Sequence, residues 1–254
     1  MILALDVGNS NIVFGCVDKE KTYFVSRLST DRSCTDDEYA IRFKNLLELN
    51  GITPEKIKGS IISSVVPQLI NILVMAVEKA VGVTPLVVGP GVKTGLNIKI
   101  DNPAQLGSDL VVDAVAALDA YPVPLVIIDM GTATTISVVD KNKYYLGGMI
   151  LPGVKISLDA LTSRTSLLQG ISLEVPKKVI GSNTIDCMKS GLVYGNASVL
   201  DGLIDRIEEE LGEKVTAVAT GGLSKSIVPY CKREIIVDDN LLLKGLYLIY
   251  QKNI

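Results

Sequence analysis

The pattern of apolar and polar residues divides the first half of the chain into strands followed by alternating helices and strands. Alternation through residues 1–30 predicts a β-hairpin or meander. A helix is expected over 33–51, because Thr35 and Glu38 have the spacing of a capping box and Gly51 follows. The pattern then predicts, in order, a strand over 59–66, a helix from Pro67 to about Val81, a strand over 84–89 and a glycine-rich loop over 89–96. A helix follows over 103–120, opening near GSDL.

The second half of the chain repeats this order. Strands are expected on both sides of DMGTATT and at YYLGGMI, followed by a helix over 154–168. A long helix over 183–212 is expected to break near Gly191 and Gly195. A strand ending in a Gly-Gly turn, a short strand at EIIVDD and a helix over 241–251 complete the chain. Strands first, then alternating strands and helices, predict an α/β protein with two similar mixed sheets.

One local motif occurs once in each half. In MILALDVGNSNIVFGCVD and in LVIIDMGTATTISVVD, an apolar run ends in Asp-x-Gly, small polar residues follow, and a second apolar run closes at an aspartate. The spacing of the two copies is about half the chain, which indicates duplicated domains, since solenoid repeats are much shorter. Pro122 and Pro124 mark the expected boundary, giving domains 1–121 and 122–254.

Composition narrows the chemistry. The 254 residues are 48% hydrophobic with a net charge of -3, which favours a globular protein and argues against a nucleic-acid-binding surface. The chain lacks the run of roughly 18 apolar residues that a membrane span needs and has no basic signal-peptide region. The four cysteines form no C-x-x-C pair, so we expect a cytoplasmic protein with reduced thiols. Without any histidine, the general base must be another residue type.

The Asp-x-Gly turns suit phosphate chemistry. Backbone N–H groups and hydroxyls in such a turn can hold phosphate oxygens, and Asp6 next to them would need a cation such as Mg²⁺. The alternative is a simple hairpin turn, for which Asn, Gly and Ser are equally suited. Gly221 and Gly222, in ATGGLSKS, would let a nucleotide approach the backbone closely. The alternative there is a strand-to-helix turn capped by Ser224.

Together, DVGNSNIV, DNPAQLGSDL, DMGTATT, GGMILPGVKISLDAL, GSNTIDCMKSG and TGGLS resemble the motifs of the type III pantothenate kinases, in order over nearly the whole chain. The resemblance implies two ribonuclease-H-like domains, each a mixed sheet flanked by helices, in the actin-like ATPase fold. It also implies transfer of the ATP γ-phosphate to pantothenate, giving 4'-phosphopantothenate in the first step of coenzyme A synthesis. The family uses Mg²⁺ and a monovalent cation, K⁺ or NH₄⁺, and works as a homodimer.

The resemblance also assigns roles to residues. Asp109 would be the general base, and Asp129 would bind the monovalent cation. Nucleotide contacts would come from both turns and from the Gly-Gly turn, namely Asp6, Val7, Gly8, Asn9, Ser10, Asn11, Ile12, Val13, Thr132, Gly221 and Gly222. The pantothenate pocket would contain Gly107, Ser108, Asp109, Leu110 and, from the neighbouring subunit, Thr184. Without the resemblance, Asp109 reads as a first-turn carboxylate stabilised by the helix dipole, and Thr184 as an N-cap.

The chain departs from the family pattern next to the expected base. Leu110 stands where the family has arginine, and Asp113 where it usually has asparagine. Arginine suits a carboxylate such as that of pantothenate, and Asp113 lies one helical turn from Asp109, where two carboxylates hinder each other's ionisation. Three alternatives follow: a pantothenate kinase that holds this carboxylate differently, a kinase with another acceptor, or a non-catalytic regulatory protein similar to the Bvg accessory factors.

Overall fold

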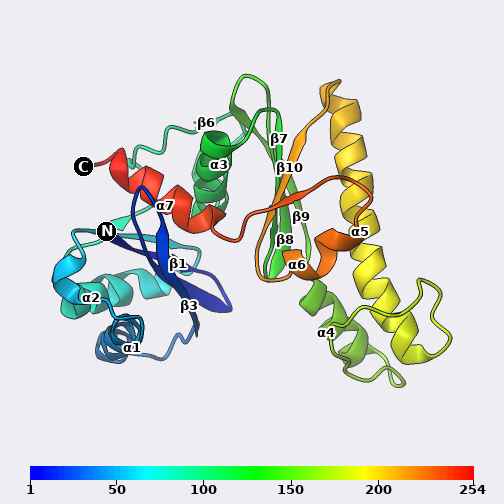
Figure 1. Ribbon diagram of the computed structural model, residues 1–254, viewed down its shortest axis with the longest axis horizontal. Helices are drawn as coiled ribbons and strands as arrows, with labels where there is room; N and C mark the ends of the chain where they lie inside the picture. Colours follow the sequence, from blue (N-terminus) through cyan, green and yellow to red (C-terminus); the bar gives the residue numbers. More distant parts are fainter. The chain divides into compact units, whose positions relative to one another are not determined.

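The computed structural model describes residues 1–254, which form two compact units (Figure 1). Unit 1 comprises Met1–Leu96, Asp101–Asp119 and Asn240–Ile254, and unit 2 comprises Asn97–Ile100 and Ala120–Asp239. The change of unit at Asp119 lies close to the boundary expected at Pro122. The C-terminal helix differs from the expectation, because it packs in unit 1 although it follows the second half of the chain.

Unit 1 is built on a five-stranded sheet of order β3-β2-β1-β4-β5. Its central strand β1 pairs antiparallel with β2 and parallel with β4, so the predicted meander opens a mixed sheet. The strand after residue 84 is shorter than expected. The strands are β1 (Ile2–Val7), β2 (Asn11–Val17), β3 (Thr22–Ser29), β4 (Ser60–Ser64) and β5 (Leu86–Val87).

Helices cover both faces of this sheet. Alternate residues of β1, Leu3, Leu5 and Val7, are buried in one core with residues of α1 and α2. On unit 1, α7 contacts β1, β2 and β4. The helices are α1 (Asp36–Leu49), α2 (Ile70–Val81), α3 (Ser108–Ala120) and α7 (Leu241–Gln251), with short 3-10 turns at Pro54–Lys56, Pro67–Leu69 and Pro103–Gln105.

Two local predictions in unit 1 have clear outcomes. The capping box at the start of α1 is confirmed, since Thr35 accepts a bond from the Glu38 N–H and the Glu38 carboxylate accepts one from the Thr35 N–H. The helix expected to open near GSDL is also confirmed, since α3 begins at Ser108, and the residues before it form a 3-10 turn that ends at Gln105. Asp109 therefore lies in the first turn of α3.

Unit 2 contains a six-stranded sheet of order β11-β10-β7-β8-β9-β6. Its core packs β7, β8 and β10 against α4, α5 and α6. Helix α5 continues through Gly191 and Gly195, so the expected break is absent. The elements are β6 (Asn97–Ile98), β7 (Leu125–Met130), β8 (Ala133–Val139), β9 (Tyr144–Pro152), α4 (Val154–Arg164), α5 (Thr184–Leu211), β10 (Thr216–Thr220), α6 (Ser224–Ile227), a 3-10 turn at Val228–Tyr230 and β11 (Ile236–Val237).

The two sheets share one topology, which confirms the two similar mixed sheets predicted from the repeat. Strand β7 pairs antiparallel with β8 and parallel with β10, as β1 does with β2 and β4. Even an irregularity is repeated: the second strand of each meander shifts register at Cys16/Val17 and at Val138/Val139.

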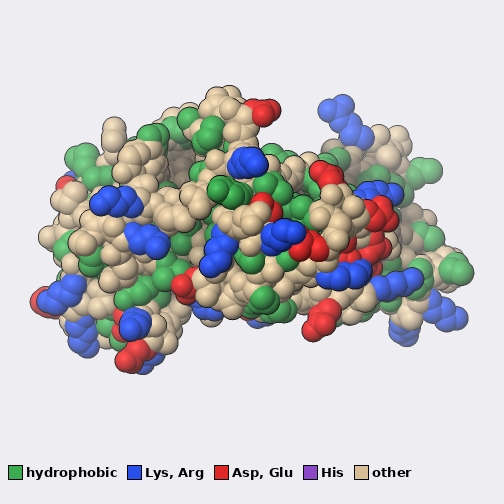
Figure 2. Space-filling view, turned by 90° about the horizontal axis from the view of Figure 1, so that it is seen from above, with side chains coloured by type: hydrophobic (Ala, Val, Ile, Leu, Met, Phe, Trp, Pro, Cys, Tyr) green, Lys and Arg blue, Asp and Glu red, His purple; other side chains and the backbone are tan.

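On the face shown in Figure 2, basic and acidic side chains are interspersed. No helix is long and apolar enough to cross a membrane.

Candidate nucleotide and acceptor site

The first Asp-x-Gly motif forms a tight turn between β1 and β2. The Gly8 N–H donates to the Asn11 carbonyl oxygen at 3.0 Å, closing the turn. Side chains of Asn9, Ser10 and Asn11 are exposed at its tip, whereas Val7 and Ile12 are fully buried in the core. Val7 and Ile12, which are both assigned to nucleotide binding, can therefore contribute only backbone groups.

Asp109 is brought to the same edge of the unit 1 sheet by Ser108. The Ser108 hydroxyl accepts bonds from the Ser63 hydroxyl at 3.0 Å and the Ser64 N–H at 3.2 Å, and donates to the Ser64 carbonyl at 3.1 Å. Ser63 is the register partner of Asp6 in the parallel β1–β4 pair. The first turn of α3 is therefore attached to the end of β4 beside the strand that carries Asp6.

The Asp109 carboxylate occupies a partly buried position next to Gly107. Burial raises the pKa of Asp109, and its bond from the Leu110 N–H at 2.9 Å lowers it less. A Cβ on Gly107 would overlap Asp109 Oδ1, so glycine leaves room for this carboxylate. Asp113, one helical turn further along α3, is buried, with 2% of its surface exposed. Its expected effect on the ionisation of Asp109 stays a prediction.

The second Asp-x-Gly motif forms the corresponding turn of unit 2. Asp129 is the next-to-last residue of β7, the Gly131 N–H donates to the Ala133 carbonyl at 3.0 Å, and the Thr132 side chain is exposed. Gly221 lies against this turn with φ +90°, and an added Cβ would lie 2.6 Å from Met130 N and overlap Asp129 Oδ1. Only glycine permits this approach, so the structure brings Gly221 and Asp129 together.

Thr184 begins α5 and is exposed. The N-cap is Asn183, whose side-chain oxygen accepts a bond from the Asp186 N–H at 2.9 Å. The reading of Thr184 as an N-cap is therefore wrong. Ser224 is likewise not a cap residue; it is the first residue of α6, and its hydroxyl donates to the Gly221 carbonyl at 2.8 Å.

Sequence reasoning missed two residues that organise the site, Ser63 and Ser64. They end the buried strand β4, and polar residues at the end of an otherwise apolar strand were the signal that could have revealed them. For metal binding, no group of three acidic or cysteine side chains is present. Asp6 and Asp129 are separate oxygen donors, which fits Mg²⁺ or K⁺ held mostly by water and phosphate rather than by a protein cage.

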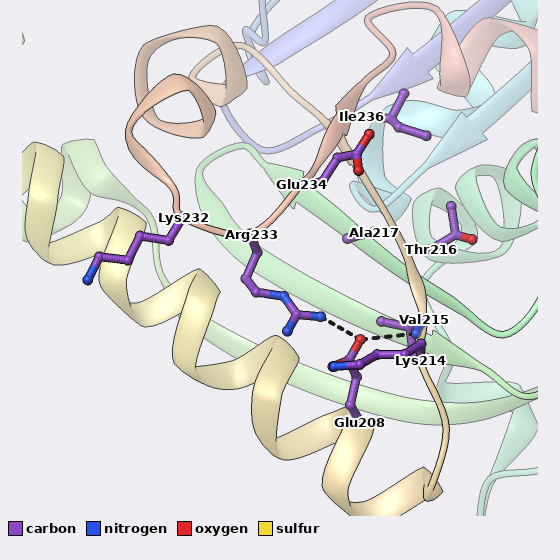
Figure 3. A pocket seen from close by; sticks show the side chains of 9 residues that line it. All are labelled: Glu208, Lys214, Val215, Thr216, Ala217, Lys232, Arg233, Glu234 and Ile236. Carbon is purple, nitrogen blue, oxygen red and sulfur yellow. Dashed lines mark hydrogen bonds and ion pairs between the residues drawn. The ribbon is translucent and has the colours of Figure 1, made fainter.

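An open pocket lies elsewhere in unit 2 (Figure 3). It has a volume of about 420 Å³ and includes Thr216 and Ala217, at the opposite end of β10 from Gly221. Its buried Glu208 accepts bonds from Arg233 at 2.5 Å and from the Val215 N–H at 3.2 Å, as the dashed lines show. The pocket contains none of the predicted site residues, and its buried Glu208 is paired with Lys214 and Arg233.

Comparison with known proteins identifies the fold. A Baf family protein from Campylobacter jejuni has a TM-score of 0.62 at 22% identity, with 99% of this chain and 98% of that chain covered. Component A of (R)-2-hydroxyglutaryl-CoA dehydratase from Acidaminococcus fermentans has a TM-score of 0.58 at 14% identity, covering 98% and 96%. These likenesses show the fold, which is the duplicated ribonuclease-H-like architecture of the actin-like ATPases.

The sequence itself identifies the family. A type III pantothenate kinase from Bacillus cytotoxicus is 45% identical over 253 residues, covering 100% of this chain and 97% of that protein. The family model for type III pantothenate kinases matches residues 2–206, which include both Asp-x-Gly turns and Asp109. The chain therefore belongs to the type III pantothenate kinase family.

Proposed function

We propose that this protein transfers the γ-phosphate of ATP to the primary hydroxyl of pantothenate, in the first step of coenzyme A synthesis. Family membership supports the activity. The observation that carries the proposal is the attachment of α3 to β4 through Ser108, because it sets Asp109 at the sheet edge that carries the Asp6 turn. A phosphate donor and a hydroxyl acceptor can meet at such an edge.

In this proposal, the β1–β2 turn binds the ATP phosphates through its backbone N–H groups and polar side chains. Asp109 accepts the proton of the attacking hydroxyl. Partial burial suits this role, because the raised pKa makes the carboxylate a stronger base than an exposed aspartate. When bound, Mg²⁺ would be held at Asp6 and would offset the negative charge of the phosphates.

Unit 2 supplies the remaining proposed contacts. Thr132 is exposed on its turn and has a hydroxyl that can bind an ATP oxygen. Gly221 and Gly222 present backbone without side chains, which suits close approach of the adenosine. Asp129 is the proposed ligand of K⁺ or NH₄⁺, and its carboxylate oxygen suits such a hard cation.

We also propose that the protein is a homodimer in which Thr184 completes the partner's pantothenate site. Exposed apolar side chains cluster in the sequence from β9 to the start of α5, and such surface favours a partner: Ile150, Ile156, Leu161, Leu167, Val179, Ile180 and Ile185. Ile180→Asp should give a monomer in sedimentation velocity, whereas Leu49→Asp, on α1 of unit 1, should leave the dimer intact. A parent protein that sediments as a monomer would contradict the proposal.

The test of the activity is ATP-dependent phosphorylation of pantothenate with millimolar Mg²⁺ and K⁺. Asp109→Asn should lower kcat by about 10²–10⁴-fold, the usual contribution of a general base. Asp119→Asn is the matched control, since Asp119 is exposed near the end of the same helix. Equal activity in Asp109→Asn and the parent would reject the base assignment. A parent that binds ATP but does not phosphorylate pantothenate would favour another acceptor or a regulatory role.

A further inference from the structure

The phosphate turn of unit 1 has no basic residue of its own. Residues 6–13 read DVGNSNIV, with one carboxylate and no lysine or arginine. ATP bound as proposed above would place several negative charges beside Asp6. Enzymes that transfer phosphoryl groups neutralise this charge with lysine, arginine and metal ions. A cationic side chain from outside the turn is therefore of particular interest.

Arg32 lies beside this turn. Its Nη2 donates to the side-chain oxygen of Asn9 at 3.2 Å. The side chain is exposed and takes part in none of the chain's ion pairs. Because a guanidinium has five N–H donors and an amide oxygen does not neutralise its charge, Arg32 keeps its positive charge and further donors for a ligand.

The backbone around Arg32 is attached to the turn on one side and to α1 on the other. The Thr30 hydroxyl donates to the Gly8 carbonyl at 2.7 Å, and the Thr30 N–H donates to the Ser10 carbonyl at 3.0 Å. The buried Tyr39 hydroxyl accepts from the Asp31 N–H at 3.0 Å and donates to the Asp31 carbonyl at 2.8 Å. These hydrogen bonds fix the backbone position from which the Arg32 side chain extends, so less conformational entropy is lost when Arg32 binds a ligand.

The neighbouring carboxylate of Asp31 does not cancel this charge by pairing with it. Its Oδ1 accepts bonds from the Ser33 hydroxyl at 2.6 Å and the Ser33 N–H at 2.9 Å, and its Oδ2 accepts one from the Cys34 thiol at 3.3 Å. These bonds lower the pKa of Asp31 to about 2. Asp31 is thus occupied within its own loop, and Arg32 extends towards Asn9 instead.

We propose that Arg32 binds the terminal phosphate oxygens of ATP, with Asn9 orienting its guanidinium. The planar fork of arginine can donate two parallel bonds to a phosphate group, which lysine cannot. The proposal rests on ATP being the nucleotide of the proposed function, and it adds a binding residue outside the two Asp-x-Gly motifs.

Titration calorimetry of the full chain with ATP and with AMP tests this role. Arg32→Gln should raise the Kd for ATP by roughly ten- to a hundredfold, the loss expected for a charge-assisted bond, and should leave the Kd for AMP unchanged. Arg32→Lys should recover part of the loss. Arg206→Gln is the control, because the Arg206 guanidinium bonds the Gly202 carbonyl of its own helix. Equal ATP affinity in Arg32→Gln and Arg206→Gln would overturn the proposal, as would an equal loss for ATP and AMP.

These measurements separate this inference from the proposed function. If the parent phosphorylates pantothenate and Arg32→Gln binds ATP normally, the inference is wrong and the function stands. If ATP binding depends on Arg32 but pantothenate is not phosphorylated, the inference stands and the acceptor is wrong. A parent that binds no ATP would reject both.

Discussion

Replacement of Gly221 by alanine tests how closely the Gly-Gly turn approaches Asp129. At φ +90°, an L-residue is strained by about 1–2 kcal/mol. The new Cβ would also lie 2.6 Å from Met130 N and 2.7 Å from Met130 C. Backbone atoms cannot move aside as a flexible side chain can, and overpacking of this kind costs about 1–3 kcal/mol. We therefore expect Gly221→Ala to lower the free energy of unfolding by about 2–5 kcal/mol.

Thermal unfolding followed by scanning fluorimetry measures this cost. For a chain of this size, each kcal/mol shifts Tm by about 2–4 °C, so a decrease of about 4–20 °C is expected. Gly212→Ala is the matched control: Gly212 also has positive φ, +71°, but nothing lies within 4 Å of an added Cβ. The control isolates the backbone strain, and the difference between the variants measures the close approach. Equal Tm decreases in the two variants would refute the close packing of Gly221 on Asp129.

Four further predictions concern the candidate site. Because burial raises the pKa of Asp109, the acid limb of kcat/KM should lie above pH 3.8, and a limb at or below that pH would contradict Asp109 as the base. A raised carboxyl pKa gives stability that is present at low pH and lost as pH rises through the folded-state pKa, so Asp109→Asn should match or exceed the parent Tm at pH 7. Asp6→Asn should retain the parent Tm but lose at least tenfold in kcat/KM for ATP, and unchanged kinetics would contradict a role at the phosphates. Leu110→Arg should lower the KM for pantothenate by up to about tenfold if the carboxylate contact is missing, whereas an unchanged KM would mean that the contact is made elsewhere.

Elements set by local pattern could be predicted from the sequence. The β1–β2–β3 meander follows from alternating residues, and the start of α1 follows from the Thr35 and Glu38 capping box. Elements set by distant packing could not be predicted as well. Nothing local to α7 shows that it packs on unit 1, where Gly245 lies so close to the Val112 carbonyl that a Cβ would overlap it. Strand β6 has two residues, too few to show a period.

The candidate site divides in the same way. The turns at Asp6 and Asp129 were recognisable, because each motif is contiguous and is repeated. The bonds that join Ser108 to Ser63 and Ser64 cross more than forty positions of the chain, and no periodicity encodes them. The same limit applies to Asp113. Helical spacing places it near Asp109, but only the packing around α3 shows that it is buried.

Divergence between the duplicated units explains how one motif can serve two purposes. In unit 1, Ser64 follows the register partner of Asp6. The Ser64 backbone forms hydrogen bonds with the Ser108 hydroxyl, and these bonds hold the helix that carries the proposed base. In unit 2, the residue after the register partner of Asp129 is Gly221, where the missing Cβ lets the backbone close on the aspartate. A side chain at the second position would exclude that approach. The same strand end therefore anchors a helix in one unit and forms a close-packed glycine turn in the other.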